Sequence, residues 1–210
     1  MHAYILLDRS GSMQSLWVEA LSSVNAYAKE LANKTDGDAV DSYVTLAVFD
    51  GQEGLQFDLL RKKNPALHWE NVTDREAAPR GMTPLLDALG RIIALAETDN
   101  HDKAVIVVMT DGQENASREV TRDGVKAALE RVKKRGWDVV FLGANFDNIS
   151  DAASVGVGAA QQMAMAPGAM AASMTVMAKK SRAYFARGET HAFEEADRQV
   201  AQESKVKGNK

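Results

Sequence analysis

Short hydrophobic runs alternate along the chain with segments whose apolar residues recur at helical spacing. The apolar runs, which are typical of buried strands, cover residues 3–7, 42–49, 104–109 and 137–142. The helical spacing predicts helices over 15–33, 85–97, about 119–134, 147–154 and 168–186. The Asp-Gly signal at 50–54 predicts a hairpin turn, so that 55–60 would pair antiparallel with the strand before it.

This alternation of strands and helices predicts an α/β, Rossmann-like fold. We expect a central, mostly parallel sheet of about six strands, one of them antiparallel, with helices on both faces. A short edge strand over 161–165 would be the last strand of the sheet. The long segment 61–84 is expected to be mostly irregular, and a loop of that length in a compact domain is usually functional.

The C-terminal part has two features of its own. Met170, Met174 and Met177 fit one helical stripe, for which core packing against the sheet is favoured over a methionine-rich partner surface. Residues 188–210 are polar, which predicts a solvated helix that frays into a tail. We therefore expect one domain over 1–187, closed by a helix at about 168–187, and a tail over 188–210.

Composition narrows the function classes. The 25 basic and 29 acidic residues give a net charge of −4, which argues against a nucleic-acid partner. No apolar run approaches the roughly 20 residues that span a bilayer, and no signal-like segment opens the chain, so we expect a cytoplasmic protein without a membrane partner. The absence of cysteine excludes a disulfide scaffold, a thiolate zinc site and a cysteine nucleophile.

Polar side chains follow the predicted strands where each strand ends. Ligands of open α/β sheets bind outside these carboxyl ends, so we expect the side chains to lie close together. They are Asp8, Ser10 and Ser12 after the first strand, Thr83 at the end of the long loop, and Asp111 after the strand at 104–109. Because all of them offer oxygen, they favour Mg²⁺, Mn²⁺ or Ca²⁺ over zinc or copper. Gly11 and Gly112 are expected to let the two loops turn sharply.

These residues carry a resemblance to a known family. The sequence "DRSGS" (8–12) matches D-x-S-x-S, the first element of the metal-ion-dependent adhesion site in von Willebrand factor type A (vWA) domains. Thr83 in "GMTPL" is similar to the second element of that site, and Asp111 in "MTDGQEN" is similar to the third. The resemblance covers about 4–155 and suggests a bacterial or phage-type stand-alone member with a complete site. Met82, where many relatives have glycine, departs from the pattern.

The resemblance implies a binding mechanism rather than catalysis. Ser10, Ser12 and Thr83 would bind the metal directly through neutral hydroxyls, and Asp8 and Asp111 would act largely through bridging waters. An ion held in this way keeps much of its charge, so that an Asp or Glu of a partner protein can complete its coordination. The expected cofactor is Mg²⁺, with Mn²⁺ or Ca²⁺ as alternatives. The resemblance also implies a AAA+ ATPase complex as a candidate partner.

Other interpretations stay open at this stage. In one alternative, Ser12, Ser15 or Thr83 serve only as helix caps, Thr83 with Pro84 at the first helical position. In another, the protein is an assembly component of a virion or surface apparatus, with a metal that stabilises its own fold. A metal-assisted hydrolase is the least favoured class. A serine hydrolase would need a base, and His68 is the one histidine that could face the site.

Four polar residues flank the predicted site without a fixed role. Glu114 and Asn115 would either tune the site or belong to a solvated loop. Asp87 is expected to be solvated or to act through another residue, and Asn145 to be a turn residue or an indirect contributor.

Overall fold

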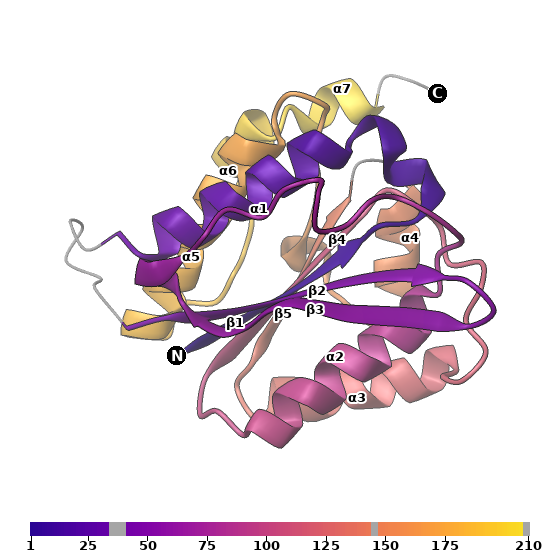
Figure 1. Ribbon diagram of the computed structural model, residues 1–210. Helices are drawn as coiled ribbons and strands as arrows, with labels where there is room; N and C mark the ends of the chain where they lie inside the picture. The colour runs from indigo at the N-terminus through magenta and orange to yellow at the C-terminus, as the bar shows by residue number, and fades with distance from the viewer. Residues whose placement is uncertain (34–40, 144–146, 208–210) are drawn as a thin grey trace.

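A six-stranded sheet lies between two layers of helices in the computed structural model (Figure 1). The structure describes residues 1–33, 41–143 and 147–207. The strands are β1 (His2–Asp8), β2 (Tyr43–Gly51), β3 (Leu55–Pro65), β4 (Ala104–Thr110), β5 (Asp138–Gly143) and β6 (Gln162–Ala164). Their order is β3-β2-β1-β4-β5-β6, and β2 with β3 is the antiparallel pair in an otherwise parallel sheet. The predicted α/β fold is therefore confirmed.

Helices cover both faces of this sheet, as Figure 1 shows. On one face lie α1 (Trp17–Leu31) and α5 (Met170–Arg187), and on the other lie α2 (Leu85–Asp99), α3 (Arg122–Lys134) and α4 (Asp147–Ser154). The buried central strand β1 shares its side chains between the two layers, because neighbours along a strand point to opposite faces. Ile5 and Leu7 pack under α1 and α5, whereas Tyr4 and Leu6 pack under α2 and α3.

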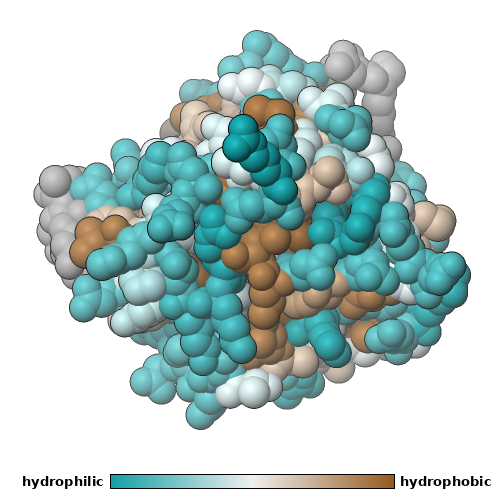
Figure 2. All heavy atoms as spheres, in the orientation of Figure 1, coloured by the Kyte–Doolittle hydropathy of each residue, from teal (hydrophilic) through white to brown (hydrophobic). Residues whose placement is uncertain are grey.

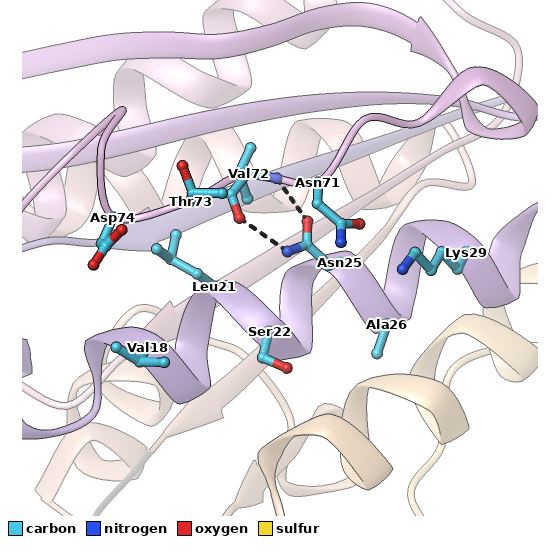
Figure 3. A pocket seen from close by; sticks show the side chains of 10 residues that line it. All are labelled: Val18, Leu21, Ser22, Asn25, Ala26, Lys29, Asn71, Val72, Thr73 and Asp74. Atoms are coloured by element: carbon cyan, nitrogen blue, oxygen red, sulfur yellow. Dashed lines mark hydrogen bonds between the residues drawn. The ribbon is translucent and has the colours of Figure 1, made fainter.

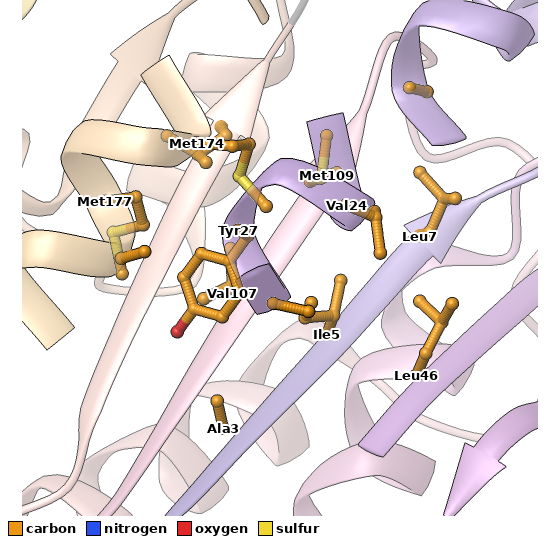
Figure 4. Close-up of a cluster of buried hydrophobic side chains, with 14 of the residues drawn as sticks. Ala3, Ile5, Leu7, Val24, Tyr27, Leu46, Val107, Met109, Met174 and Met177 are labelled. Carbon is orange, nitrogen blue, oxygen red and sulfur yellow. The ribbon is translucent and has the colours of Figure 1, made fainter. Parts of the chain in front are cut away.

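The methionine stripe of α5 belongs to the core. Met170, Met174 and Met177 are at most 2% exposed and pack with α1 and the sheet. Figure 4 shows Met174 and Met177 close to Tyr27 of α1, above Val107. The favoured prediction of core packing is therefore confirmed.

Strand β3 ends later than predicted, and the irregular segment accordingly begins later. Strand β3 continues to Pro65, whereas the irregular segment was expected to begin at residue 61. Its last residues pair with the start of β2, where shifts in register interrupt the ladder. The sequence there shows no alternation of apolar and polar residues that would predict this pairing. The irregular loop proper therefore begins after a 3-10 turn at Ala66–His68 and runs to the start of α2.

The segment after α5 folds back onto the domain instead of fraying as expected. It forms α6 (Glu195–Val200) and α7 (Glu203–Lys207), and the Ala166 N–H donates to the Ala201 carbonyl at 2.9 Å. Fully buried His191 ties the segment down, with its ring nitrogens 2.8 Å from Asp138 and 3.1 Å from Ser181. These contacts resemble a catalytic triad, but Ser181 is also fully buried, so the arrangement is a structural clamp.

Exposed large hydrophobic side chains are scattered over several elements, among them Val18, Leu67 and Met82. Figure 2 shows that the face in view is mostly hydrophilic, with hydrophobic side chains gathered in a narrow strip near its middle. Among the residues that the structure describes, none of the helices combines the length and the apolar character that crossing a membrane requires.

Candidate metal centre

The first loop of the site begins where β1 ends, at the carboxyl edge of the parallel sheet. Asp8 is fully buried there, and its Oδ1 accepts a 2.7 Å hydrogen bond from the Ser10 N–H. This bond curls the chain around the carboxylate, in the manner of an Asx turn. The hydroxyls of Ser10 and Ser12 then lie 3.0 Å apart, so the loop presents both on one side.

The loop after β4 meets this first loop. Ser12 donates its hydroxyl hydrogen to Asp111 Oδ1 at 2.7 Å, although the two residues are 99 positions apart. Thr110 donates to the other carboxylate oxygen of Asp8, Oδ2, at 2.6 Å. Because β1 and β4 are parallel neighbours, their carboxyl ends hold these groups at the same edge.

The position of Thr83, on the third segment of the site, follows from what surrounds Gly112. A Cβ atom added to Gly112 would lie 2.7 Å from Thr83 Oγ1, 3.2 Å from Ser12 Oγ and 3.4 Å from Asp8 Oδ2. Oxygens from the first loop and from the segment of Thr83 thus surround one point on the loop after β4, and only glycine leaves that point unfilled. Together with Ser10 and Asp111, the structure brings all five predicted residues to one place.

The glycine in the first loop has a different status. The backbone φ of Gly11 is not in the left-handed region, and a Cβ there would meet only the Gly81 carbonyl, at an ordinary 3.5 Å. The expectation that Gly11 is needed to avoid a clash is therefore wrong. Glycine is required at Gly112, but the reason is that a side chain there would clash with the surrounding oxygens, not that the loop turns sharply.

The electrostatics of this cluster favour a bound cation. Burial raises the pKa of Asp8 to about 6, against the hydrogen bonds from Thr110 and Ser10, which lower it, and the nearby Asp111 charge adds to the rise. Burial also raises the pKa of Asp111. Two carboxylates that lose hydration side by side are destabilised when both are charged, and a divalent cation offsets that cost.

The donor set fits a hard divalent ion. It consists of hydroxyl and carboxylate oxygens, and neither sulfur nor imidazole belongs to it. Within the described residues there is no cluster of three or more His, Cys, Asp or Glu side chains suited to a metal. This agrees with a site that contains two carboxylates and otherwise relies on neutral hydroxyls.

Helix capping does not explain these hydroxyls. Helix α1 begins after Leu16 and α2 begins after Pro84, and neither helix has a side-chain capping bond at its N-cap. The 3-10 turn Gly11–Ser15 follows Ser10, whose side chain also makes no capping bond. The alternative interpretation of Ser12, Ser15 and Thr83 as caps is therefore wrong.

Thr83 is held in place by the loop after β4. Its N–H donates to Asn115 Oδ1 at 2.9 Å, and the Asn115 N–H donates back to the Thr83 carbonyl at 3.1 Å. The Glu114 carboxylate accepts from the Leu86 N–H at 2.8 Å, and thus satisfies a donor in the first turn of α2. Glu114 and Asn115 therefore position the segment that carries Thr83.

Asp87 anchors the same loop from inside α2. It is 3% exposed, and its carboxylate accepts backbone N–H bonds from Arg118, Glu119 and Val120 at 2.8–3.0 Å. A solvated role is therefore wrong, and Asp87 acts by fixing the backbone. Asn145 lies outside the described residues.

A buried ion network, which the sequence analysis missed, joins the long loop to the first loop. Arg9, at 5% exposure, donates from Nε and Nη2 to Asp50 Oδ1 at 3.1 and 3.0 Å, and Arg80 donates to Asp50 Oδ2 at 2.8 Å. The Arg80 N–H also donates to the Arg9 carbonyl at 2.8 Å. Arg9 and Asp50 are 41 positions apart, so no local sequence pattern predicts that they pair. The one available signal was that Arg9 lies between the predicted ligands Asp8 and Ser10.

His68, the base that a hydrolase was expected to use, does not lie at this site. His68 lies in the 3-10 turn beside Ser42, since the Ala66 N–H donates to the Ser42 carbonyl just before β2 begins. The amino end of β2 is the edge of the sheet opposite Asp8, because β1 and β2 are parallel. His68 therefore cannot assist Ser10.

Comparisons with solved structures support the same fold. The pilus adhesin SpaC from Lactobacillus rhamnosus GG superposes with a TM-score of 0.62 at 16% identity, over 88% of this chain and 31% of that one. Manganese-loaded TRAP protein from Plasmodium vivax gives 0.54 at 17% identity, over 82% and 70%. Proximal thread matrix protein 1 from the mussel byssus, with a zinc-occupied MIDAS motif, gives 0.57 at 14% identity, over 84% and 45%.

The chain thus spans less than half of the mussel protein and about a third of the adhesin. A search of curated proteins finds no match to it. The family model of the von Willebrand factor type A domain matches residues 3–202, which extends past β6 and through α6. The chain belongs to the von Willebrand factor type A domain family.

Proposed function

We propose that the chain binds a divalent cation at this edge of the sheet and uses it to capture an acidic side chain of a partner protein. Ser10, Ser12 and Thr83 would hold the ion directly. Asp8 and Asp111 would hold it largely through water. The bound cation would supply the positive charge that attracts the partner's carboxylate.

The single observation that carries the proposal is the set of oxygens around the missing Gly112 side chain. The first loop and the segment before α2 place Asp8, Ser12 and Thr83 within 2.7–3.4 Å of that point. Neutral hydroxyls coordinate a cation without cancelling its charge, so a further negative ligand remains favourable. The solved structures with manganese and with a zinc-occupied MIDAS motif support a divalent ion at such a site. We propose Mg²⁺ as the resident ion, with Mn²⁺ or Ca²⁺ as substitutes.

The proposal is tested by capture of partners from a lysate of the source organism in Mg²⁺ and in chelator. Asp111→Ala should lose the Mg²⁺-dependent partner. Asp102→Ala is the matched control, because Asp102 is exposed just before β4, at the opposite edge of the sheet. Capture that is unchanged in Asp111→Ala, with the fold intact by circular dichroism, contradicts the proposal. A AAA+ ATPase among the captured proteins would bear out that partner, which is so far a prediction.

In a second candidate function, the chain is a structural component and the bound metal stabilises its own fold. The observation in its favour is the full burial of Asp8 near a second carboxylate, Asp111. In that case Mg²⁺ would raise the melting temperature strongly and chelation would abolish no partner contact. The two candidates are separated by measuring melting temperature and capture on the same samples.

A further inference from the structure

A groove of about 490 Å³ runs beside α1. It lies in the helix layer of α1 and α5, on the face of the sheet opposite α2 and α3. Its floor is apolar and buried, with Leu21 at 3% and Val72 at 2% exposure. Asn25 fixes the facing wall, because its amide donates to the Val72 carbonyl at 3.0 Å and accepts from the Val72 N–H at 2.9 Å (Figure 3). The groove is therefore a built feature of the fold and not a gap between mobile side chains.

The two ends of this groove, the α1 groove, carry opposite charges. Figure 3 shows Asp74 and Val18 at one end and Lys29 at the other. The side chains of Asp74 and Lys29 make no hydrogen bond or ion pair with another residue in the described part of the chain. Val18 is 72% exposed, more than any other large hydrophobic side chain that the structure describes. An exposed apolar side chain and two unmatched charges thus line one groove.

We propose that the α1 groove is the interface of a symmetric homodimer. A two-fold axis that lies in the interface, perpendicular to α1, sets the two α1 helices antiparallel and swaps the ends of the groove. Lys29 of each copy then meets Asp74 of the other, and each Val18 packs at the opposite end of the other groove. A parallel arrangement would instead place Lys29 against Lys29, so the charges select the antiparallel one.

The shape of the groove agrees with a protein surface as its occupant. Val18 and Lys29 are eleven positions apart on α1, or about 16 Å of helix, which is long for a compact small molecule. Between them the groove is lined by the small side chains of Ser22 and Ala26, which permit close approach of a second helix. The proposal does not depend on the metal site, because none of the five site residues lines the groove.

Sedimentation equilibrium of the full chain, over micromolar to millimolar concentrations, tests the proposal. We expect a reversible dimer that weakens as salt is raised, with the same dissociation constant in Mg²⁺ and in chelator. Lys29→Glu and Asp74→Lys should each weaken the dimer about tenfold or more, since symmetry creates two like-charge contacts. The double variant should restore the wild-type constant, because it exchanges the two charges.

Val18→Lys should also dissociate the dimer, because it sets a like charge against Lys29 of the other copy, and Lys134→Glu should not. Lys134 is the matched control: it is exposed at the end of α3, on the other face of the sheet. A protein that stays monomeric at every concentration overturns the proposal. So does a dimer whose dissociation constant is unchanged in Val18→Lys, or a charge-swapped double variant that stays as weak as the single ones. Val18 and Lys29 are exposed, so their variants should fold, and circular dichroism checks that they do.

Discussion

Gly112→Ala is the sharpest test of how the metal centre is built. The added Cβ would lie 2.7 Å from Thr83 Oγ1, whereas ordinary contact begins at 3.4 Å, so the threonine or the loop must shift by about 0.7 Å. Mg²⁺ holds its oxygens at about 2.0–2.1 Å and tolerates deviations of only about 0.2 Å. The shift is therefore larger than the site can absorb. We expect the affinity for Mg²⁺ or Mn²⁺ to fall by roughly 10–100-fold, the range seen when a ligand loses its support.

The protein without metal should tolerate the same change. Overpacking against buried Thr83 should cost about 1–3 kcal/mol of folding free energy. Calorimetric titration with Mn²⁺, together with urea melts in chelator, separates the two effects. Gly11→Ala is the control in the neighbouring loop, since its Cβ would meet only the Gly81 carbonyl at 3.5 Å. Wild-type affinity in Gly112→Ala, or an equal loss in Gly11→Ala, would refute this account of the site.

Two further predictions concern groups around the centre, and a third concerns His2 at the opposite edge of the sheet. Asp87→Asn should lower the free energy of unfolding by about 2–3 kcal/mol, because three backbone N–H groups lose a charged acceptor. Urea melts measure this loss, and a loss of less than about 0.5 kcal/mol would contradict the prediction. Asp50→Asn should cost about 3 kcal/mol by the same assay and also weaken Mn²⁺ binding, since buried Arg9 and the loop that carries Thr83 lose their shared partner. Burial and the neighbouring His101 lower the pKa of His2 to about 3, so the unfolded chain takes up a proton that the folded one refuses. Stability should then fall as pH drops below about 6.5, by at most about 1.4 kcal/mol for each pH unit from this group, and His2→Phe should flatten the profile.

Each of these predictions needs its own comparison. For Asp87→Asn, the exposed Asp123 in the first turn of α3 offers an acidic control, Asp123→Asn, that should leave stability within about 0.5 kcal/mol. For Asp50→Asn, unchanged Mn²⁺ affinity despite lower stability would show that the network supports the fold alone. For His2→Phe, stability that falls between pH 7 and pH 5 as steeply as in the wild type would assign the dependence to other groups.

Sequence reasoning performed well where the pattern is local or periodic. The parallel strands are nearly continuous apolar runs, so β1 and β4 were located to within a residue at each end. Asp8, Ser10, Ser12, Thr83 and Asp111 were grouped correctly, because the carboxyl ends of parallel strands meet at one edge. Their role as metal ligands is still a prediction.

It failed where the structure depends on contacts between distant segments. The folding of 188–207 depends on His191, Asp138 and Ser181, whose pairings span up to 53 positions and leave no periodic trace. For Asp87 the sequence left a solvated and an indirect role open, and only the contact with the distant loop at 118–120 decides between them. Gly112 was expected to be important for its backbone freedom, whereas the structure shows that the space left by its missing side chain matters.

The central claim is most directly tested by a crystal structure of the protein grown with Mn²⁺, using the anomalous signal of the metal. We expect one strong anomalous peak bounded by the hydroxyls of Ser10, Ser12 and Thr83, close to the carboxylates of Asp8 and Asp111, and no peak there in Asp111→Ala. A peak at saturating Mn²⁺ that lies elsewhere on the protein, or none at all, would contradict the claim that these residues form a metal centre.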